Sequence, residues 1–328
     1  MLKTNYFILL LLAAALFTGC HDSPDMEVTV HSCAVVPFHR ACATCFSVED
    51  RVYVFGGRDS LGVKKNDLWR YDASTDQWTS VGTTPLKPRV NATACVTRDG
   101  KVYIGLGFNG TLWQDSCYLC DWWEFNEAAG TWKRLADYPN RCTDHATAFA
   151  DEGELYVGYG FRYNYRRDMF RYDIAANQWD SIDVQVDFFG YPPRSFGGTG
   201  CSCQGRHFMG TGYYQHSLDW WAELVDGTHW EQRKAVPGRA RTLAACTATG
   251  QYIYLTAGLH YGGVNTTGEV MRDIRRYDPQ TDKWTYVAVL PEGIFNHICF
   301  HVGKRVYIGL GETEEWKTVN QLYYIIEE

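Results

Sequence analysis

One unit recurs six times along this chain, and this repetition constrains the fold more than any other feature. Each copy contains an apolar segment that ends at a glycine, and the six segments are 52–57, 102–107, 155–160, 208–212, 254–258 and 306–311. The final glycines lie 50, 53, 52, 46 and 53 residues apart. A period near 50 residues is typical of propeller blades made of four short strands. The repeat therefore predicts an all-β fold with six blades, one for each copy.

A second signal within each copy supports the same register. In four copies an aromatic residue followed by Asp or Asn stands seven residues before a tryptophan: Tyr71 and Trp78, Phe125 and Trp132, Tyr172 and Trp179, Tyr277 and Trp284. The fourth copy keeps Trp230 without the Tyr-Asp pair. The Asp or Asn begins a turn between antiparallel strands, and a tryptophan on the outer strand can pack between neighbouring sheets. We expect these tryptophans at matching positions of the outer strands.

These residues and their period resemble the Kelch repeat family over essentially all of residues 40–328. The glycine pair of the family motif is intact only at Gly56-Gly57, so the resemblance rests on the period and the tryptophans. It implies a single six-bladed Kelch-type β-propeller, which we assign to residues 28–328.

The last blade lacks an outer strand, because the chain stops soon after its third strand at 322–326. The segment 28–36, followed by Pro37 and Arg40, is similar to the passage that leads from Trp78 to Pro88-Arg89 between blades one and two. We therefore expect the N-terminal segment to supply the missing outer strand and close the ring, which leaves no exposed sheet edge.

The N-terminus has the pattern of a secretory signal. Lys3 precedes an apolar run over 7–17, which is too short to span a bilayer. The run ends in Thr18-Gly19-Cys20, which resembles a bacterial lipobox. We expect a signal peptide at 1–19, a lipidated Cys20 and a short anchor segment at 20–27. The protein would then be an outer-membrane lipoprotein of the cell envelope, on the periplasmic face or the cell surface. Without lipidation it would be periplasmic or secreted.

Charge and hydropathy limit the partners. The formal net charge is −7 and there is no Lys/Arg run, so nucleic acid is not an expected partner. No second long apolar segment follows, and we expect membrane contact only through the lipid anchor. We expect a monomer without a cofactor, with an acidic sugar or glycan, or other envelope proteins, as its partners.

The cysteines admit three interpretations. Cys42 and Cys45, and Cys117 and Cys120, have the spacing of metal ligands, yet each pair lies in a different copy and we expect no metal site. Four cysteines stand twelve residues before a closing glycine, and we expect buried free thiols at one shared position of the innermost strands: Cys45, Cys95, Cys246 and Cys299. One disulfide could form among Cys117, Cys120 and Cys142, with the pair left open.

Arginines recur just before the innermost strands. They are Arg40, Arg89, Arg141, Arg194, Arg239 and Arg241, with Asn296 and His297 at the same place in blade six. One interpretation is structural, in which the guanidinium groups bond loop carbonyls and neighbouring acids. The other is functional: guanidinium groups that converge on the axis would bind a carboxylate or sulfate.

The loops that follow the second strands carry aromatic and polar side chains suited to sugars, including Tyr213, Tyr214 and Trp316. Together with the arginines they define the expected ligand-binding set: Arg40, Arg89, Asn91, Arg141, His145, Arg194, Tyr213, Arg241, Asn296 and His297.

Three functions remain open from the sequence. The first is a lipoprotein that binds an acidic sugar or glycoconjugate at the arginine-lined mouth. The second is a sialic acid mutarotase, because a secreted six-bladed Kelch protein resembles the bacterial N-acetylneuraminate epimerase family. Glu312 matches the start of that family's Glu and Arg loop, but Thr318 stands where the arginine is expected. The third is a protein-interaction scaffold.

Acid–base candidates independent of this resemblance are Asp144-His145 and His297. Neighbouring residues of a regular strand point to opposite faces, so we expect that Asp144 and His145 do not form a pair.

Overall fold

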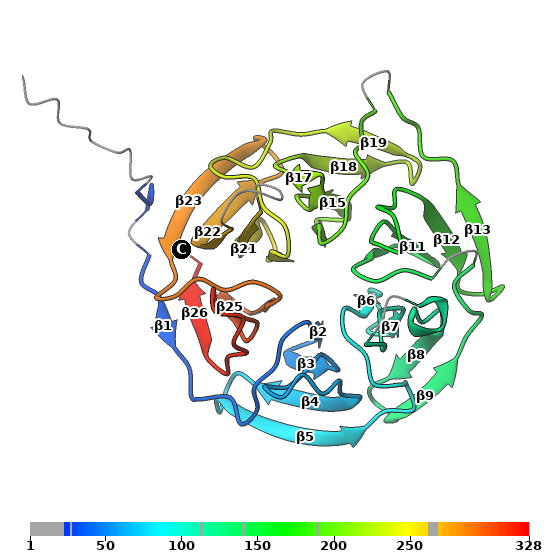
Figure 1. Ribbon diagram of the computed structural model, residues 1–328, viewed down its shortest axis with the longest axis horizontal. Coiled ribbons are helices and arrows are strands. Elements are labelled where there is room, and N and C mark those ends of the chain that lie inside the picture. Colours follow the sequence, from blue (N-terminus) through cyan, green and yellow to red (C-terminus); the bar gives the residue numbers. More distant parts are fainter. Residues whose placement is uncertain are drawn as a thin grey trace, which may run out of the picture.

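The computed structural model describes residues 23–26, 28–111, 114–139, 142–187, 190–261 and 268–327. Six four-stranded antiparallel sheets surround a central axis, as Figure 1 shows face-on. The expected signal peptide, the lipidation site Cys20 and Arg141 lie outside the described residues. Among those residues no helix is long and apolar enough to cross a membrane.

Each of the first three blades runs outward from the axis in chain order. Blade one contains β2 (Thr44–Val48), β3 (Arg51–Phe55), β4 (Asp67–Asp72) and β5 (Gln77–Thr83). Blade two contains β6 (Thr93–Val96), β7 (Val102–Gly105), β8 (Trp122–Asn126) and β9 (Thr131–Arg134), with one turn of 3-10 helix at Asp115–Cys117. Blade three contains β10 (Thr147–Ala150), β11 (Glu154–Gly158), β12 (Met169–Asp173) and β13 (Gln178–Ile182).

Blades four and five repeat this order, and blade six takes its outermost strand from the N-terminal segment. Blade four contains β14 (Thr199–Cys203), β15 (Arg206–Gly210), β18 (Trp221–Val225) and β19 (His229–Gln232), with a small hairpin of β16 (Tyr213–Tyr214) and β17 (His216–Ser217). Blade five contains β20 (Ala245–Ala248), β21 (Ile253–His260), β22 (Glu269–Asp278) and β23 (Lys283–Val289). Blade six contains β24 (Ile298–Val302), β25 (Arg305–Gly309), β26 (Leu322–Ile326) and β1 (His31–Ser32).

Blade six confirms the expected closure. β1 pairs with β26 in antiparallel register, with His31 opposite Tyr324 and Ser32 opposite Tyr323. In Figure 1 the blue N-terminal strand lies beside the red C-terminal strand. The ring is therefore closed by strands from both ends of the chain.

The tryptophans occupy matching positions, as the repeat predicts. Each stands second in its outer strand, opposite a large residue of the third strand, in the pairs Tyr71–Trp78, Phe125–Trp132, Tyr172–Trp179, Leu224–Trp230 and Tyr277–Trp284. Six apolar clusters fill the six junctions between neighbouring blades. Apolar burial between blades is thus the main cohesive force of the ring.

The innermost strands carry small residues because six strands converge on one axis. Cys45 opposite Val54, Cys246 opposite Leu255 and Cys299 opposite Ile308 share one register and line the axis, all as free thiols. The prediction for Cys95 is wrong in part. This thiol is free and buried, but it stands opposite Tyr103, so its neighbour Ala94 faces the axis instead. The longer turn of blade two shifts the pairing by one residue, and a shift by one moves a side chain to the other face of a strand.

Candidate functional site

A belt of backbone hydrogen bonds surrounds the axis at one end of the propeller. In every blade the residue two positions before the innermost strand has a positive φ. It lies between 52° and 56° at Cys42, Asn91, His145, Leu243 and Asn296, and is 62° at Gly197 in blade four. The backbone amides of Cys42, Asn91, His145, Leu243 and Asn296 bond the carbonyl of the counterpart in the preceding blade. Cys42 to Asn296, Asn91 to Cys42 and Asn296 to Leu243 measure 2.9–3.1 Å. The left-handed conformation turns these side chains out of strand alternation.

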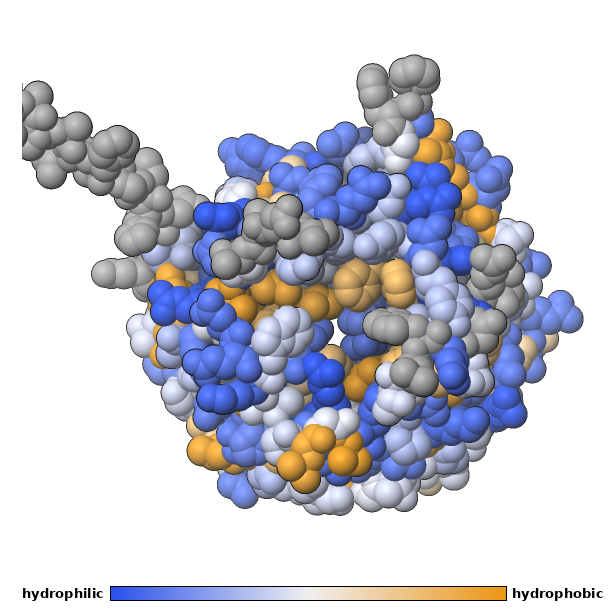
Figure 2. Space-filling view, in the orientation of Figure 1, coloured by the Kyte–Doolittle hydropathy of each residue, from blue (hydrophilic) through white to orange (hydrophobic). Residues whose placement is uncertain are grey.

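The belt forms the rim of a cavity of about 200 Å³ on the axis. Asn91, His145, Asn296 and His297 all line this cavity, so the structure brings together these four members of the expected set. This end of the propeller faces the viewer in Figures 1 and 2, and in Figure 2 its centre is hollowed. We call it the mouth.

Asp144 and His145 form a side-chain pair at the mouth, contrary to our expectation. His145 Nδ1 lies 3.1 Å from Asp144 Oδ2, and the Asn91 amide donates to the same oxygen at 3.2 Å. The prediction assumed a regular strand, but β10 begins only at Thr147 and His145 has φ 54°. Within the described part of the chain, His145 Nε2 and Asp144 Oδ1 are buried without a hydrogen-bond partner. Such buried atoms require water or a ligand.

A second polar group lies between blades six and one. Glu312 is buried, and one of its oxygens accepts from Arg58 while the other accepts from the Asn296 amide at 3.0 Å. The Arg58 side chain is 35% exposed and is thus within reach of a ligand. This glutamate is the one that resembles the epimerase motif, and its partner Arg58 comes from another blade.

His297 lies where burial disfavours the charged imidazolium. Complete burial lowers the pKa of His297 to about 3, so the imidazole stays neutral near pH 7. Its Nε2 lies 2.8 Å from Thr256 Oγ1. His297 can therefore only donate or accept hydrogen bonds at the cavity wall.

Three of the expected mouth arginines are locked inside their own blades. Arg40, Arg89 and Arg241 are 0–3% exposed. Each donates to both oxygens of an aspartate and to the carbonyl before the closing glycine; the aspartates are Asp67, Asp121 and Asp273, and the carbonyls are those of Gly56, Leu106 and Ala257.

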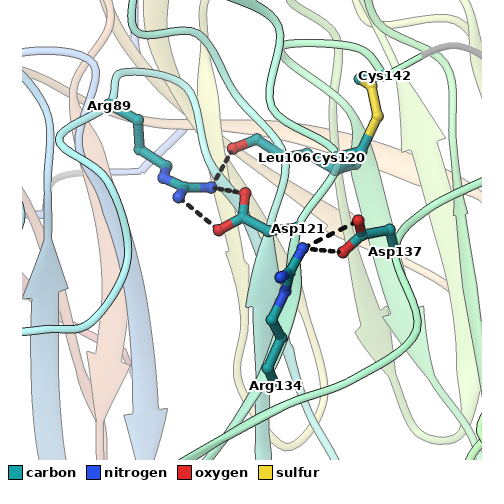
Figure 3. Close-up of a disulfide and its surroundings, with 7 residues drawn as sticks. All are labelled: Arg89, Leu106, Cys120, Asp121, Arg134, Asp137 and Cys142. Carbon is teal, nitrogen blue, oxygen red and sulfur yellow. Dashed lines mark hydrogen bonds and ion pairs between the residues drawn. A yellow bond between two sulfur atoms is a disulfide. The ribbon is translucent and has the colours of Figure 1, made fainter.

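These contacts are those of the structural interpretation, and the three guanidinium groups do not converge on the axis. Bidentate pairing satisfies the guanidinium groups within the fold, so no charge is left for a ligand. We call each such arginine–aspartate pair a lock. Figure 3 shows the lock of blade two, Arg89 with Asp121, next to the disulfide Cys120–Cys142. That disulfide joins the loop before β8 to the segment before β10.

Blade four lacks this pair. Ser195 stands at the position of Arg40, Arg89 and Arg241, and its neighbour Arg194 is exposed. Trp220 occupies the position of the locking aspartate, directly before Trp221, which pairs with Gly210 as Trp122 pairs with Gly105. The Trp220 indole donates to the Thr211 carbonyl at 2.6 Å, the carbonyl that an arginine takes in other blades. Arg194 lines a different pocket, together with Arg166 and Arg167.

Aromatic side chains form a second pocket at the mouth, of about 290 Å³. It is lined by Phe161, Tyr165, Phe196, Tyr213, Thr242, Leu243, Leu259, Tyr261 and Trp316. Leu243 belongs to both this pocket and the axial cavity. Tyr213 is thus near the axial group, as expected, but in the neighbouring pocket. Within the described residues, no group of three or more His, Cys, Asp and Glu side chains could hold a metal ion.

Sequence reasoning missed Arg58 and the locking aspartates. The signal that could have found these pairs is an aspartate in or directly before the third strand, 27 residues after Arg40 and 32 after Arg89 and Arg241. For Arg58 no local signal exists, because its partner Glu312 is 254 residues away.

Comparisons with known proteins agree with this architecture. The KLHDC2/KLHL20/DRC7 Kelch-repeats domain family matches residues 25–212, and the Kelch motif matches residues 240–290. N-acetylneuraminate epimerase 1 of Escherichia coli O6:H1 is 29% identical over 120 residues, which cover 35% of this chain and 29% of that protein. Kelch domain-containing protein 10 of Homo sapiens is 25% identical over 295 residues, with 80% of this chain and 63% of that protein covered. The matches thus span less than two thirds of both relatives.

The solved structure of YjhT superposes with a TM-score of 0.71 at 16% identity, covering 88% of this chain and 96% of that one. At this identity the likeness shows a common fold. The Kelch-repeats family match over residues 25–212, more than half of the sequence, identifies the family. The chain belongs to the Kelch-repeat family of β-propellers.

Proposed function

We propose that the protein binds a sugar that bears a carboxylate at the mouth of the propeller. The observation that carries this proposal is that a polar cavity on the axis adjoins an aromatic pocket, with Leu243 lining both. The axial cavity offers the amide and imidazole groups of Asn91, His145 and Asn296, and the adjoining pocket offers aromatic rings. Sugars are bound by this combination, because their C–H faces stack on rings while their hydroxyls hydrogen-bond to amides.

Arg58 is the cation that we assign to the ligand carboxylate. It replaces Arg40, Arg89 and Arg241, which are committed to aspartates. Glu312 already holds Arg58 in place, so the guanidinium group is preorganised and keeps N–H groups for a second acceptor.

Calorimetry with N-acetylneuraminic acid and its methyl ester tests this proposal. We expect the acid to bind more tightly than the ester. Arg58→Gln should lower the affinity for the acid about 10-fold and leave the affinity for the ester unchanged. Arg58→Lys keeps the charge opposite Glu312 and should fold normally. Arg134→Gln, an exposed arginine on β9, is the matched control. Equal affinities for acid and ester would refute the role of Arg58, and absence of any sugar binding would refute the function.

A second candidate function, sugar mutarotation, is favoured by the Asp144–His145 pair and by the partial identity to an epimerase. Mutarotation needs a base that takes the proton of the anomeric hydroxyl and an acid that protonates the ring oxygen as the ring C–O bond breaks. The ring then closes on the other face with the reverse transfers. With its proton on Nδ1 facing Asp144, the imidazole would present Nε2 as the base.

NMR exchange between the two anomers separates the two functions. An enzyme would accelerate the exchange, and His145→Gln would abolish the acceleration, whereas His229→Gln, on the exposed outer strand of blade four, would not. Sugar binding with unchanged exchange would leave a binding protein. If neither sugar binding nor exchange occurs, a protein-interaction scaffold is the remaining hypothesis.

We also propose that the protein is anchored to the cell envelope through Cys20. The support is the sequence pattern 18–20 after the apolar run 7–17. Labelled palmitate should be incorporated into the natural chain and not into Cys20→Ser. Equal labelling of both chains, or of neither, would refute the anchor.

A further inference from the structure

A basic pocket lies between blades three and four, apart from the axial cavity and the aromatic pocket. It has a volume of about 380 Å³ and is lined by Arg166, Arg167, Asp168, Ile182, Val184, Val186 and Arg194. None of these residues lines the axial cavity or the aromatic pocket. The basic pocket is therefore a separate site.

Two of its three arginines have no acidic partner among the described residues. Arg166 is paired with both oxygens of Asp168. Arg167 instead donates to the carbonyls of Gly190 and Pro192 at 3.1 and 3.0 Å, and Arg194 approaches only the Tyr165 carbonyl, at 3.5 Å. Burial and the like charge of Arg194 lower the pKa of Arg167. Two cations that repel each other gain from an anion placed between them.

Arg194 is not the counterpart of the arginines that bind aspartates. That position in blade four is Ser195, whose carbonyl accepts from Gly160 as those of Arg89 and Arg241 accept from Gly57 and Gly212. Trp220 stands where blades one, two and five have the aspartate, and its indole donates to the Thr211 carbonyl. Blade four thus has neither member of the pair, and Arg194 is an additional, exposed arginine.

The opposite wall of the basic pocket is apolar. Ile182 and Val184 are partly buried against the core between blades three and four, and Val186 is 42% exposed. In Figure 2 hydrophobic surface follows this part of the chain at the upper right of the molecule. A cation pair beside an exposed aliphatic strip suits a molecule with one charged end and one apolar end.

We propose that this basic pocket binds an amphipathic oxyanion, with its charged group between Arg167 and Arg194 and its alkyl chain along Val184 and Val186. A carboxylate and a phosphate monoester share this chemistry. The site is independent of the sugar site at the mouth.

Calorimetry with octanoate, octyl phosphate and octanol tests the proposal. We expect saturable binding of one or both anions and none of octanol. Arg194→Gln should lower the affinity for the anion about fivefold or more, because a charge-assisted contact at an exposed side chain is lost. Val186→Asp should abolish binding, while Arg171→Gln, an exposed arginine on β12, should change nothing.

The relative affinities of octanoate and octyl phosphate identify the natural headgroup. Absence of saturable binding, equal binding of octanol, or unchanged affinity in both Arg194→Gln and Val186→Asp would overturn the proposal. Arg194 is exposed and bonds only one carbonyl, so its replacement does not threaten folding. Sugar binding at the mouth should be unaffected in either variant.

Discussion

At the residue scale, one arrangement recurs with different outcomes. An arginine just before the innermost strand bonds an aspartate in or directly before the third strand in blades one, two and five. The bond ties the connection between blades to the sheet that it enters. Blade four has Ser195 and Trp220 at the two positions, and its exposed Arg194 stands one residue earlier in the chain. Both members of the pair are thus replaced together in this blade.

The lock of blade two predicts a large loss of stability on truncation. Arg89→Met should lower the free energy of unfolding by about 3 kcal/mol, because the partly buried Asp121 loses its charged partner. Urea denaturation of natural and variant chains measures this change.

Two further variants test whether the loss of stability arises from the unpaired charge. Arg89→Met/Asp121→Leu should recover part of the loss, because neither charge remains. Arg171→Met, on an exposed arginine, should change stability by less than about 0.5 kcal/mol. A loss in the double variant as large as in Arg89→Met would assign the effect to packing rather than to charge.

At the element scale, the strands follow from the sequence, but the geometry of the site does not. Period, tryptophan spacing and the incomplete last blade predicted six blades and the pairing of β1 with β26, because alternation and turn residues act over short distances. The Asp144–His145 pair depends on one left-handed residue, and Cys95 depends on the length of one turn. Neither feature changes the hydrophobic pattern, so neither was visible in the sequence.

The closure by β1 predicts that the N-terminal segment stabilises blade six. Val30 packs against the core between blades five and six, whereas Val35 is 70% exposed. Val30→Asp should lower the free energy of unfolding by about 2 kcal/mol, because an unpaired carboxylate would enter an apolar contact. Val35→Asp is the matched control and should be nearly neutral. Thermal unfolding that shifts equally in both variants would contradict a stabilising role for this contact.

At the scale of the whole molecule, six similar blades enclose a mouth that is not six-fold symmetric. The belt positions carry Cys42, Asn91, His145, Gly197, Leu243 and Asn296. Polar side chains therefore line the axial cavity from blades two, three and six, and Leu243 of blade five lines both this cavity and the aromatic pocket. Conserving the backbone while varying one side chain per blade is how a repeat fold builds a directional site.

The locks also predict how the whole propeller responds to acid. Burial alone would raise the pKa values of Asp67, Asp121 and Asp273, but hydrogen bonds and charge from their arginines outweigh burial, and all three pKa values are lowered. Because the folded pKa is lower than the unfolded one, near 4, the stabilisation is complete above that pH and is lost as pH falls below it. The free energy of unfolding, measured with urea between pH 7 and 3, should stay flat to about pH 5 and then decline. Arg241→Met/Asp273→Leu should decline less steeply, while Asp50→Asn, in the exposed turn after β2, should follow the natural chain. If the double variant declines as steeply as the natural chain, the acid sensitivity arises from carboxylates other than Asp273.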